Sequence, residues 1–389
     1  MLYGIWFILG IFSMLKKRSK LATALMLLFL VCVFCLNTGN PDYDHYEMQY
    51  NGIRIFGSEP IFAAMNRWFF AAGISYGVFR AVLSLIGLAL VACIVLKYSP
   101  YPALSLFVYS IYPMTMDVTQ LRFFVAYAIV VFGIRFIIHY QLHRTKRDIL
   151  FFLICIALAT GFHYSSVMYL SLALLLLNID RHKLLYMVIV PVAIVVFTFC
   201  IDRFAPVIEQ VIGARKTRLW IVGERDNSVI RVVRILFNRA MPLLYFGILQ
   251  LVSGKRPTRR VPDLDAHFSP RNPSVSLAKT ENAAEQKTDR VLFVSMLYSL
   301  MFVGLEISIS GEYERISRVG LLAGLLLFTR KLSHLNDRNR RFMIALLVLF
   351  QIVYLGIILY FMMFKYEIRY FDYVFRSVME NNWLLELLH

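Results

Sequence analysis

The chain has 389 residues, of which 59% are hydrophobic, with a formal net charge of +17 and a mean hydropathy of +0.65. Apolar runs of this number and length exceed the needs of a soluble domain, and the short alternating segments of a membrane β-barrel are absent. Most of the positive charge lies in short loops, where membrane orientation explains it without nucleic-acid binding. The composition therefore predicts an all-α polytopic membrane protein.

The apolar runs, taken in chain order, predict about twelve transmembrane helices. The expected spans are 1–15, 20–36, 81–96, 100–114, 123–138, two within 149–178, 184–201, 235–253, 291–308, 316–329 and 342–364. Residues 60–78 are interrupted by Arg67, so we expect an amphipathic helix on the outer face there. The run 149–178 has basic residues at both flanks, which favours two short spans meeting at 161–166. One long tilted helix is the alternative for this run.

This pattern divides the chain into three parts. Residues 1–253 are expected to form an N-terminal membrane bundle with outer loops at 37–59 and 203–234. Residues 254–290 are polar and contain Pro, Ser, Asn and mixed charge, which predicts a disordered cytoplasmic linker. Residues 291–389 are expected to form the C-terminal membrane helices and an interfacial aromatic tail.

The stretch 203–234 is rich in arginine, although this topology places it outside, where short basic loops are uncommon. An anionic ligand on the outer face, such as a lipid diphosphate, would explain the exception. Arg215, Lys216 and Arg218 are the expected ligands, because planar guanidinium groups pair well with phosphate oxygens. Attraction to anionic lipid headgroups is the alternative.

Other ionisable residues fall on the same predicted side of the membrane. They are Asp42, Asp44, Glu59, Arg122, His163, Arg315 and Arg318. Ionisable groups at membrane depth are costly and usually face a cavity or a partner. We therefore expect a cavity open to the outer leaflet, lined by carboxylates and guanidinium groups.

Four short motifs occur in order along the first half of the chain. They are NPDYDHY at 40–46, Glu59-Pro60, Gln120-Leu-Arg122, and GFHYSS at 161–166. In order and spacing they resemble the EpsG family of Wzy-like polysaccharide polymerases over residues 1–180. The resemblance implies a glycan polymerase of the bacterial cytoplasmic (inner) membrane that uses polyprenyl-diphosphate-linked repeat units of O-antigen or capsule. It also implies a layout like that of GT-C glycosyltransferases, with an outward-facing lateral cavity.

Such a transfer needs a base for the acceptor hydroxyl and fixed cations for the departing diphosphate. The expected bases are Asp42, Asp44, Glu59 and His163. The expected substrate contacts are Tyr43, Tyr46, Gln120, Arg122, Arg215, Lys216, Arg218, Tyr313, Arg315 and Arg318. Glu314 and Arg318 also have helical spacing and could pair with each other instead. Arginine alone can neutralise a diphosphate, so we expect neither a metal nor another cofactor, despite the spacing of Asp42 and Asp44.

The expected partners are a polyprenyl-diphosphate-linked oligosaccharide, membrane lipids and, further, a chain-length regulator. Two other classes are alternatives. An O-antigen ligase-type glycan transferase also has a basic outer loop, and a lipid-linked oligosaccharide flippase would show internal repeats and broken helices. The two halves of this chain show no clear repeat, and its polar residues gather on one face, which favours the polymerase.

Overall fold

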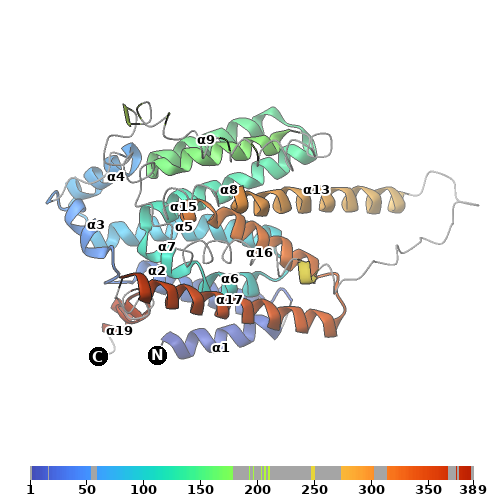
Figure 1. The fold of residues 1–389 in the computed structure, drawn as a ribbon, viewed down its shortest axis with the longest axis horizontal. Coiled ribbons are helices and arrows are strands. Elements are labelled where there is room, and N and C mark those ends of the chain that lie inside the picture. Colours follow the sequence, from blue (N-terminus) through green and yellow to red (C-terminus); the bar gives the residue numbers. More distant parts are fainter. Residues whose placement is uncertain are drawn as a thin grey trace, which may run out of the picture.

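The computed structural model describes residues 2–15, 17–53, 59–177, 273–301, 313–366 and 376–386, together with isolated residues between 192 and 249 and residue 374. The helices of these residues are α1 (Leu2–Leu15), α2 (Lys20–Cys35), α3 (Tyr43–Tyr50), α4 (Pro60–Ala71), α5 (Tyr76–Tyr98), α6 (Pro102–Ile111), α7 (Met114–Thr119), α8 (Leu121–His143), α9 (Lys146–Phe162), the 3₁₀-helix η1 (Tyr164–Leu176), α13 (Pro273–Met301), α15 (Tyr313–Ile316), α16 (Arg318–Leu332), α17 (Asp337–Tyr366), α18 (Ser377–Glu380) and α19 (Trp383–Glu386). Figure 1 shows the long helices roughly side by side, with α3, α4 and α19 at one end of the bundle. The described residues form no β-strand, which confirms the predicted all-α class for this part of the chain.

Three of the described helices are long and apolar enough to cross a membrane. They are α5, α8 and the segment Asp337–Gly356 of α17. Helices α1, α2, α6 and η1 are apolar but shorter. At the helical rise per residue, α8 extends about 35 Å, which exceeds the hydrocarbon thickness of a bilayer. The predicted total of about twelve spans includes residues outside the described ranges and stays a prediction.

Helix α8 lies at the centre of the bundle, and most of its side chains are buried. Its Phe124 is fully buried and packs against Gly87 of α5. A Cβ atom at position 87 would lie 2.4 Å from the Phe124 ring, so only glycine permits this approach of the two helices. This close packing fixes the orientation of α8 relative to α5, and with it the position of the residues at the N-terminal end of α8.

The predicted span 100–114 contains the apolar helix α6, which is shorter than expected and ends at Ile111. Helix α7 follows at Met114, after a cis bond before Pro113. Proline lacks a backbone donor and fits the start of a helix better than its interior, which explains the break. All ten residues of α6 are buried, so this segment belongs to the core.

The broken pair α6–α7 runs alongside α16. Ser99, just before α6, donates a hydrogen bond to Thr329 near the end of α16, at 3.0 Å. Asp117 of α7 pairs with Arg318 at the start of α16. The start of α6 and the end of α7 are therefore both held against α16.

The run 149–178 forms the predicted hairpin. Helix α9 ends at Phe162 and η1 begins at Tyr164, with His163 between them. Near the C-terminal end of α8, the Gln141 amide donates to the carbonyls of Leu175 and Leu177, at 2.5 and 2.7 Å. The end of η1 therefore returns to the level at which α9 starts, and the single tilted helix is excluded.

Residues 60–98 divide into two helices, as predicted, but at a different point. Helix α4 ends at Ala71 rather than at 78, and Gly73 follows with a φ of 71° that favours glycine. Helix α5 begins at Tyr76 rather than at 81, and the Ser75 side chain accepts from the Val78 amide. The change in bounds follows from this turn and cap, which the apolar pattern does not reveal.

The predicted outer loop 37–59 contains a helix, α3. Its Tyr46 and Tyr50 lie one turn apart and are both buried against aromatic side chains of α4 and α5. The Tyr50 hydroxyl donates to the Ile74 carbonyl at 2.6 Å. Burial raises the pKa of Tyr50 above its usual value, so this hydroxyl keeps the proton that it donates.

The predicted disordered linker 254–290 is wrong for residues 273–290, because α13 begins at Pro273. Asp289 of α13 pairs with Arg330 at 2.5 Å and with Lys331, both in the last turn of α16. These ion pairs hold the C-terminal part of the polar segment against α16, a contact that its composition does not predict. Residues 254–272 and most of the predicted spans 184–201 and 235–253 lie outside the described residues.

Candidate site at the N-terminal end of α8

The first ion pair of the site joins α8 to the start of α4. Arg122 donates to Glu59 at 3.1 Å, and the Glu59 side chain is only 4% exposed, whereas that of Arg122 is 17% exposed. The Arg122 guanidinium also lies over the rings of Tyr46 and Phe62, at 5.2 and 5.5 Å. Arg122 is therefore held in one position, with part of its edge still accessible.

The 40–46 motif lies beside this pair. Asp42 is half-buried and begins α3, and it is close enough to Arg122 to interact with it electrostatically. Tyr43 packs its ring against Tyr76, while Asp44 points to solvent as an exposed side chain. The structure thus brings Asp42, Tyr43 and Tyr46 to the site, and it leaves Asp44 at the surface of α3.

The second ion pair lies deeper, between α7 and α16. Arg318 donates to Asp117 at 2.7 Å and to the Gln120 side chain at 2.8 Å. Tyr109 donates to the other oxygen of Asp117 at 2.7 Å. Asp117 is fully buried and Arg318 is 2% exposed, so neither charge is stabilised by water. The acid that pairs with Arg318 is thus 201 residues away in the sequence.

Phe123 connects the second ion pair to His163. It follows Arg122 in α8, and its ring lies 5.2 Å from the Arg318 guanidinium. The His163 ring meets Phe123 edge-on, with the centroids 5.4 Å apart. His163 is buried, and its Nδ1 atom lies 2.6 Å from the Ser165 hydroxyl. One aromatic ring thus brings together groups from α8, α16 and the turn between α9 and η1.

Buried hydroxyl groups surround the second pair. Tyr127 stacks on Phe123, and Tyr127 and Tyr169 both interact electrostatically with Asp117 and Arg318. Within the described part of the chain, the hydroxyls of Tyr127 and Tyr169 have no hydrogen-bond partner. A buried hydroxyl without a partner costs free energy, and such groups are suited to bind a hydroxyl-rich ligand or water.

Several predicted site residues are placed less fully. Arg315 of α15 is half-buried and has partners, and the backbone of Tyr313 starts the same helix. Arg215, Lys216 and Arg218 lie outside the described residues. In the described ranges, no group of three or more His, Cys, Asp or Glu side chains could hold a metal ion.

The sequence motifs did not point to Asp117, Tyr109 or Arg80, which the structure places at or beside the site. The available signal was the presence of Asp117 and Arg80 within apolar stretches of sequence, because charged groups are rarely buried without a partner. Their partners are distant in the sequence or are backbone carbonyls, so no local pattern revealed them.

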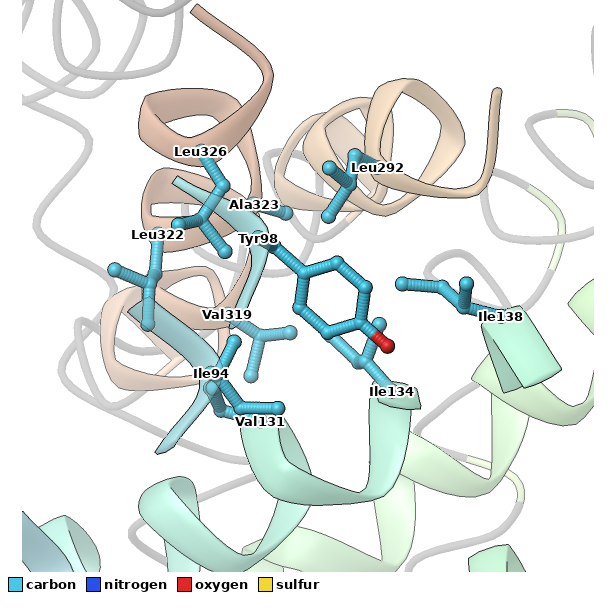
Figure 2. A pocket seen from close by; sticks show the side chains of 10 residues that line it. All are labelled: Ile94, Tyr98, Val131, Ile134, Ile138, Leu292, Val319, Leu322, Ala323 and Leu326. Atoms are coloured by element: carbon cyan, nitrogen blue, oxygen red, sulfur yellow. The ribbon is translucent and has the colours of Figure 1, made fainter. Parts of the chain in front are cut away.

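An apolar pocket lies between α5, α8, α13 and α16, beyond Val319, which follows Arg318 (Figure 2). Its lining is aliphatic apart from Tyr98. The lining has no charged group, so this pocket does not suit a phosphate, and the candidate site lies on the Arg318 side of it.

The fold and the site define a helical membrane protein with two guanidinium–carboxylate pairs near the N-terminal end of its central helix. The model of the EpsG family matches residues 20–375, nearly the whole chain. The chain therefore belongs to the EpsG family, a family of Wzy-like polysaccharide polymerases. This match confirms the resemblance carried by the four motifs and extends it to the second half of the chain. Searches of curated proteins and of solved structures gave no match.

Proposed function

We propose that this EpsG family member transfers a growing glycan from its polyprenyl diphosphate to the non-reducing end of a lipid-linked repeat unit. The observation that carries the proposal is the pair of fixed guanidinium groups at the N-terminal end of α8: Arg122 is held by Glu59, and Arg318 is held by Asp117. Arg318 also lies over Phe123, the ring that His163 meets. A departing diphosphate develops negative charge, and preorganised cations stabilise that charge without having to reorient.

In the proposed reaction, the acceptor hydroxyl attacks the anomeric carbon of the donor glycan. The new glycosidic C–O bond forms as the C–O bond to the diphosphate breaks, and the diphosphate leaves with the electron pair. Asp42 or His163 takes the hydroxyl proton. Asp42 interacts electrostatically with Arg122, and His163 meets Phe123, the ring beneath the Arg318 guanidinium. Glu59 is already paired with Arg122, which favours a positioning role for it.

The two arginines have different exposures, which suggests different tasks. Arg122 keeps an accessible edge and is proposed to contact the phosphate oxygens directly, next to Tyr46. Arg318 is buried, and it is proposed to stabilise the leaving group through its field, which is weakly screened inside the protein. Gln120 and Asp117 hold Arg318 in the orientation that this task needs.

The location of the reaction is part of the proposal. The site is placed on the outer face of the bacterial cytoplasmic membrane, in a multi-pass chain with a cavity open laterally to the lipid. The arginine-rich stretch 203–234 is proposed to face the same side. The segment 37–46, here called the acceptor loop, is proposed to receive the incoming repeat unit.

The test of the function is an assay with the purified full-length protein and synthetic lipid-linked repeat units. We expect a ladder of glycans that grows without any nucleotide sugar, because the diphosphate-linked donor already carries the energy for transfer. Folded protein that produces no ladder from the matching repeat unit would overturn the proposal. Free polymer transferred to a lipid A core acceptor instead would indicate a ligase.

Arg215 and Arg218 give a separate prediction. We expect Arg215→Ala with Arg218→Ala to shorten the glycans made in cells, because fixed cations for the diphosphate would be lost. Gel profiles of the glycans measure this change, and Arg338→Ala with Arg341→Ala, two exposed residues in the N-terminal part of α17, serves as a charge-matched control. Unchanged profiles of single-repeat and long-chain glycans would place the diphosphate contacts elsewhere.

A further inference from the structure

The acceptor loop is tied to the other end of the chain by a set of hydrogen bonds. The buried Asn37 side chain donates to the carbonyls of Ser377, Val378 and Asn381, at 3.2, 3.3 and 2.8 Å. The Thr38 amide also donates to the Asn381 carbonyl, at 2.9 Å. These residues are about 340 positions apart in sequence, so the contacts require the tertiary fold.

The same C-terminal segment holds the end of α2. The fully buried Asn382 donates from its side chain to the Cys32 carbonyl at 2.8 Å, and the Trp383 amide donates to the Leu36 carbonyl at 2.8 Å. These carbonyls belong to the last turn and cap of α2: that of Cys32 also accepts from the Leu36 amide at 3.2 Å, and that of Leu36 lies beyond the last helical residue. We call residues 376–386 the C-terminal clasp. It was predicted only as an interfacial tail.

Arg80 fixes the acceptor loop from the opposite side. It is 1% exposed and donates to the carbonyls of Phe34 and Asn37 at 2.8 and 2.9 Å, and to that of Val118 at 3.2 Å. Its guanidinium lies 5.7 Å from the Tyr43 ring centroid. One side chain therefore links α2, the acceptor loop and α7, where Val118 follows the Asp117 that holds Arg318.

The bonds continue to the motif itself. Asn40 donates to the Asn37 side chain at 2.8 Å, and its own oxygen accepts from the Asp42 amide at 3.1 Å. We propose that the C-terminal clasp and Arg80 position the acceptor loop, so that Asn37, Arg80 and Asn382 set the place of Asp42 relative to Arg122. This inference rests on the proposed function, because it assigns the loop to the acceptor.

A disulfide tests the contact without any assay of activity. A Cβ atom on Gly39 would lie 3.3 Å from the Cβ atom of Asn381, close to the separation that a disulfide bridges. We expect Gly39→Cys with Asn381→Cys to form a 39–381 disulfide under mild oxidation in membranes, detected as linked peptides by mass spectrometry. Single variants are the controls. If folded protein yields no linked peptides, the contact between the acceptor loop and the C-terminal clasp is overturned.

Kinetics test the positioning role. We expect Asn37→Ala and Asn382→Ala each to raise the KM for the acceptor repeat unit about tenfold, with a much smaller change in kcat, as lost hydrogen bonds shift the loop. Arg80→Lys should behave alike, because lysine lacks the planar fork. Glu380→Gln is the matched control, since Glu380 belongs to the clasp but pairs with Arg376 at the surface. It should leave both constants unchanged.

Rescue separates positioning from a general loss of stability. We expect the 39–381 disulfide to restore the acceptor KM of Asn37→Ala under oxidising conditions, and reduction to abolish the rescue. An acceptor KM that stays unchanged in Asn37→Ala, or a disulfide that fails to rescue it, overturns the inference. If the double-cysteine variant forms the disulfide but the wild-type protein never polymerises, the proposed function is overturned and the contact itself is established.

Discussion

Arg318→Ala is expected to abolish polymerisation and to destabilise the protein. The variant leaves the fully buried Asp117 without its cation, and breaking one side of a buried ion pair costs about 3–5 kcal/mol. Loss of the cation near the leaving group should lower the rate of transfer about 100- to 1,000-fold in the protein that still folds. Size-exclusion chromatography of detergent-solubilised protein and the glycan ladder measure the two effects.

A double variant separates stability from chemistry. Arg318→Met with Asp117→Asn removes both charges and keeps an acceptor for the Tyr109 hydroxyl, so we expect most of the folded protein to return. The ladder should stay absent, because the cation is still missing. A double variant that polymerises at the normal rate would show that Arg318 serves only the fold.

Arg122→Ala is expected to lower polymerisation about 100- to 1,000-fold while the protein remains folded, because Arg122 is partly exposed and is proposed to touch phosphate. Arg122→Lys should recover little of this loss, since lysine cannot reproduce the bidentate fork or the contacts with Tyr46 and Phe62. Initial rates with purified protein, at matched amounts of folded enzyme, give the comparison.

Glu59→Gln is the contrast for Arg122→Ala. Glutamine keeps an oxygen for Arg122 but loses the charge, so a positioning role predicts a fall of about tenfold and an unchanged pH profile. A base at this position would give a much larger fall, about 100- to 10,000-fold, and would remove one limb of the profile. The larger fall would support Glu59 as the base, which is the role that the sequence motif suggested.

The two ion pairs share a design. Each guanidinium is held by one buried carboxylate and lies over an aromatic ring, Arg122 over Tyr46 and Arg318 over Phe123. Such holding limits the side-chain motion that a flexible arginine would lose on binding a diphosphate. In both pairs the carboxylate comes from a different helix than the arginine, so the position of the cations depends on how α4 packs on α8 and α7 on α16.

Local pattern was sufficient for some features of this fold. The hairpin at 149–178 followed from its length and basic flanks, and the motif residues Tyr46, Glu59 and Arg122 do meet at one place. Prediction from local pattern failed where a tertiary contact overrides composition. The polar residues 273–290 are helical, with Asp289 of α13 bound to the end of α16.

By itself the sequence determined the class of protein and its family, because hydrophobic runs and short motifs are local and additive properties of a chain. Only the tertiary structure decided which charges meet. Asp117 finds Arg318 at a separation of 201 residues, and Asn37 finds the C-terminal clasp some 340 residues away. A buried charge or amide must have a partner inside an apolar bundle, and the folded packing of helices selects that partner.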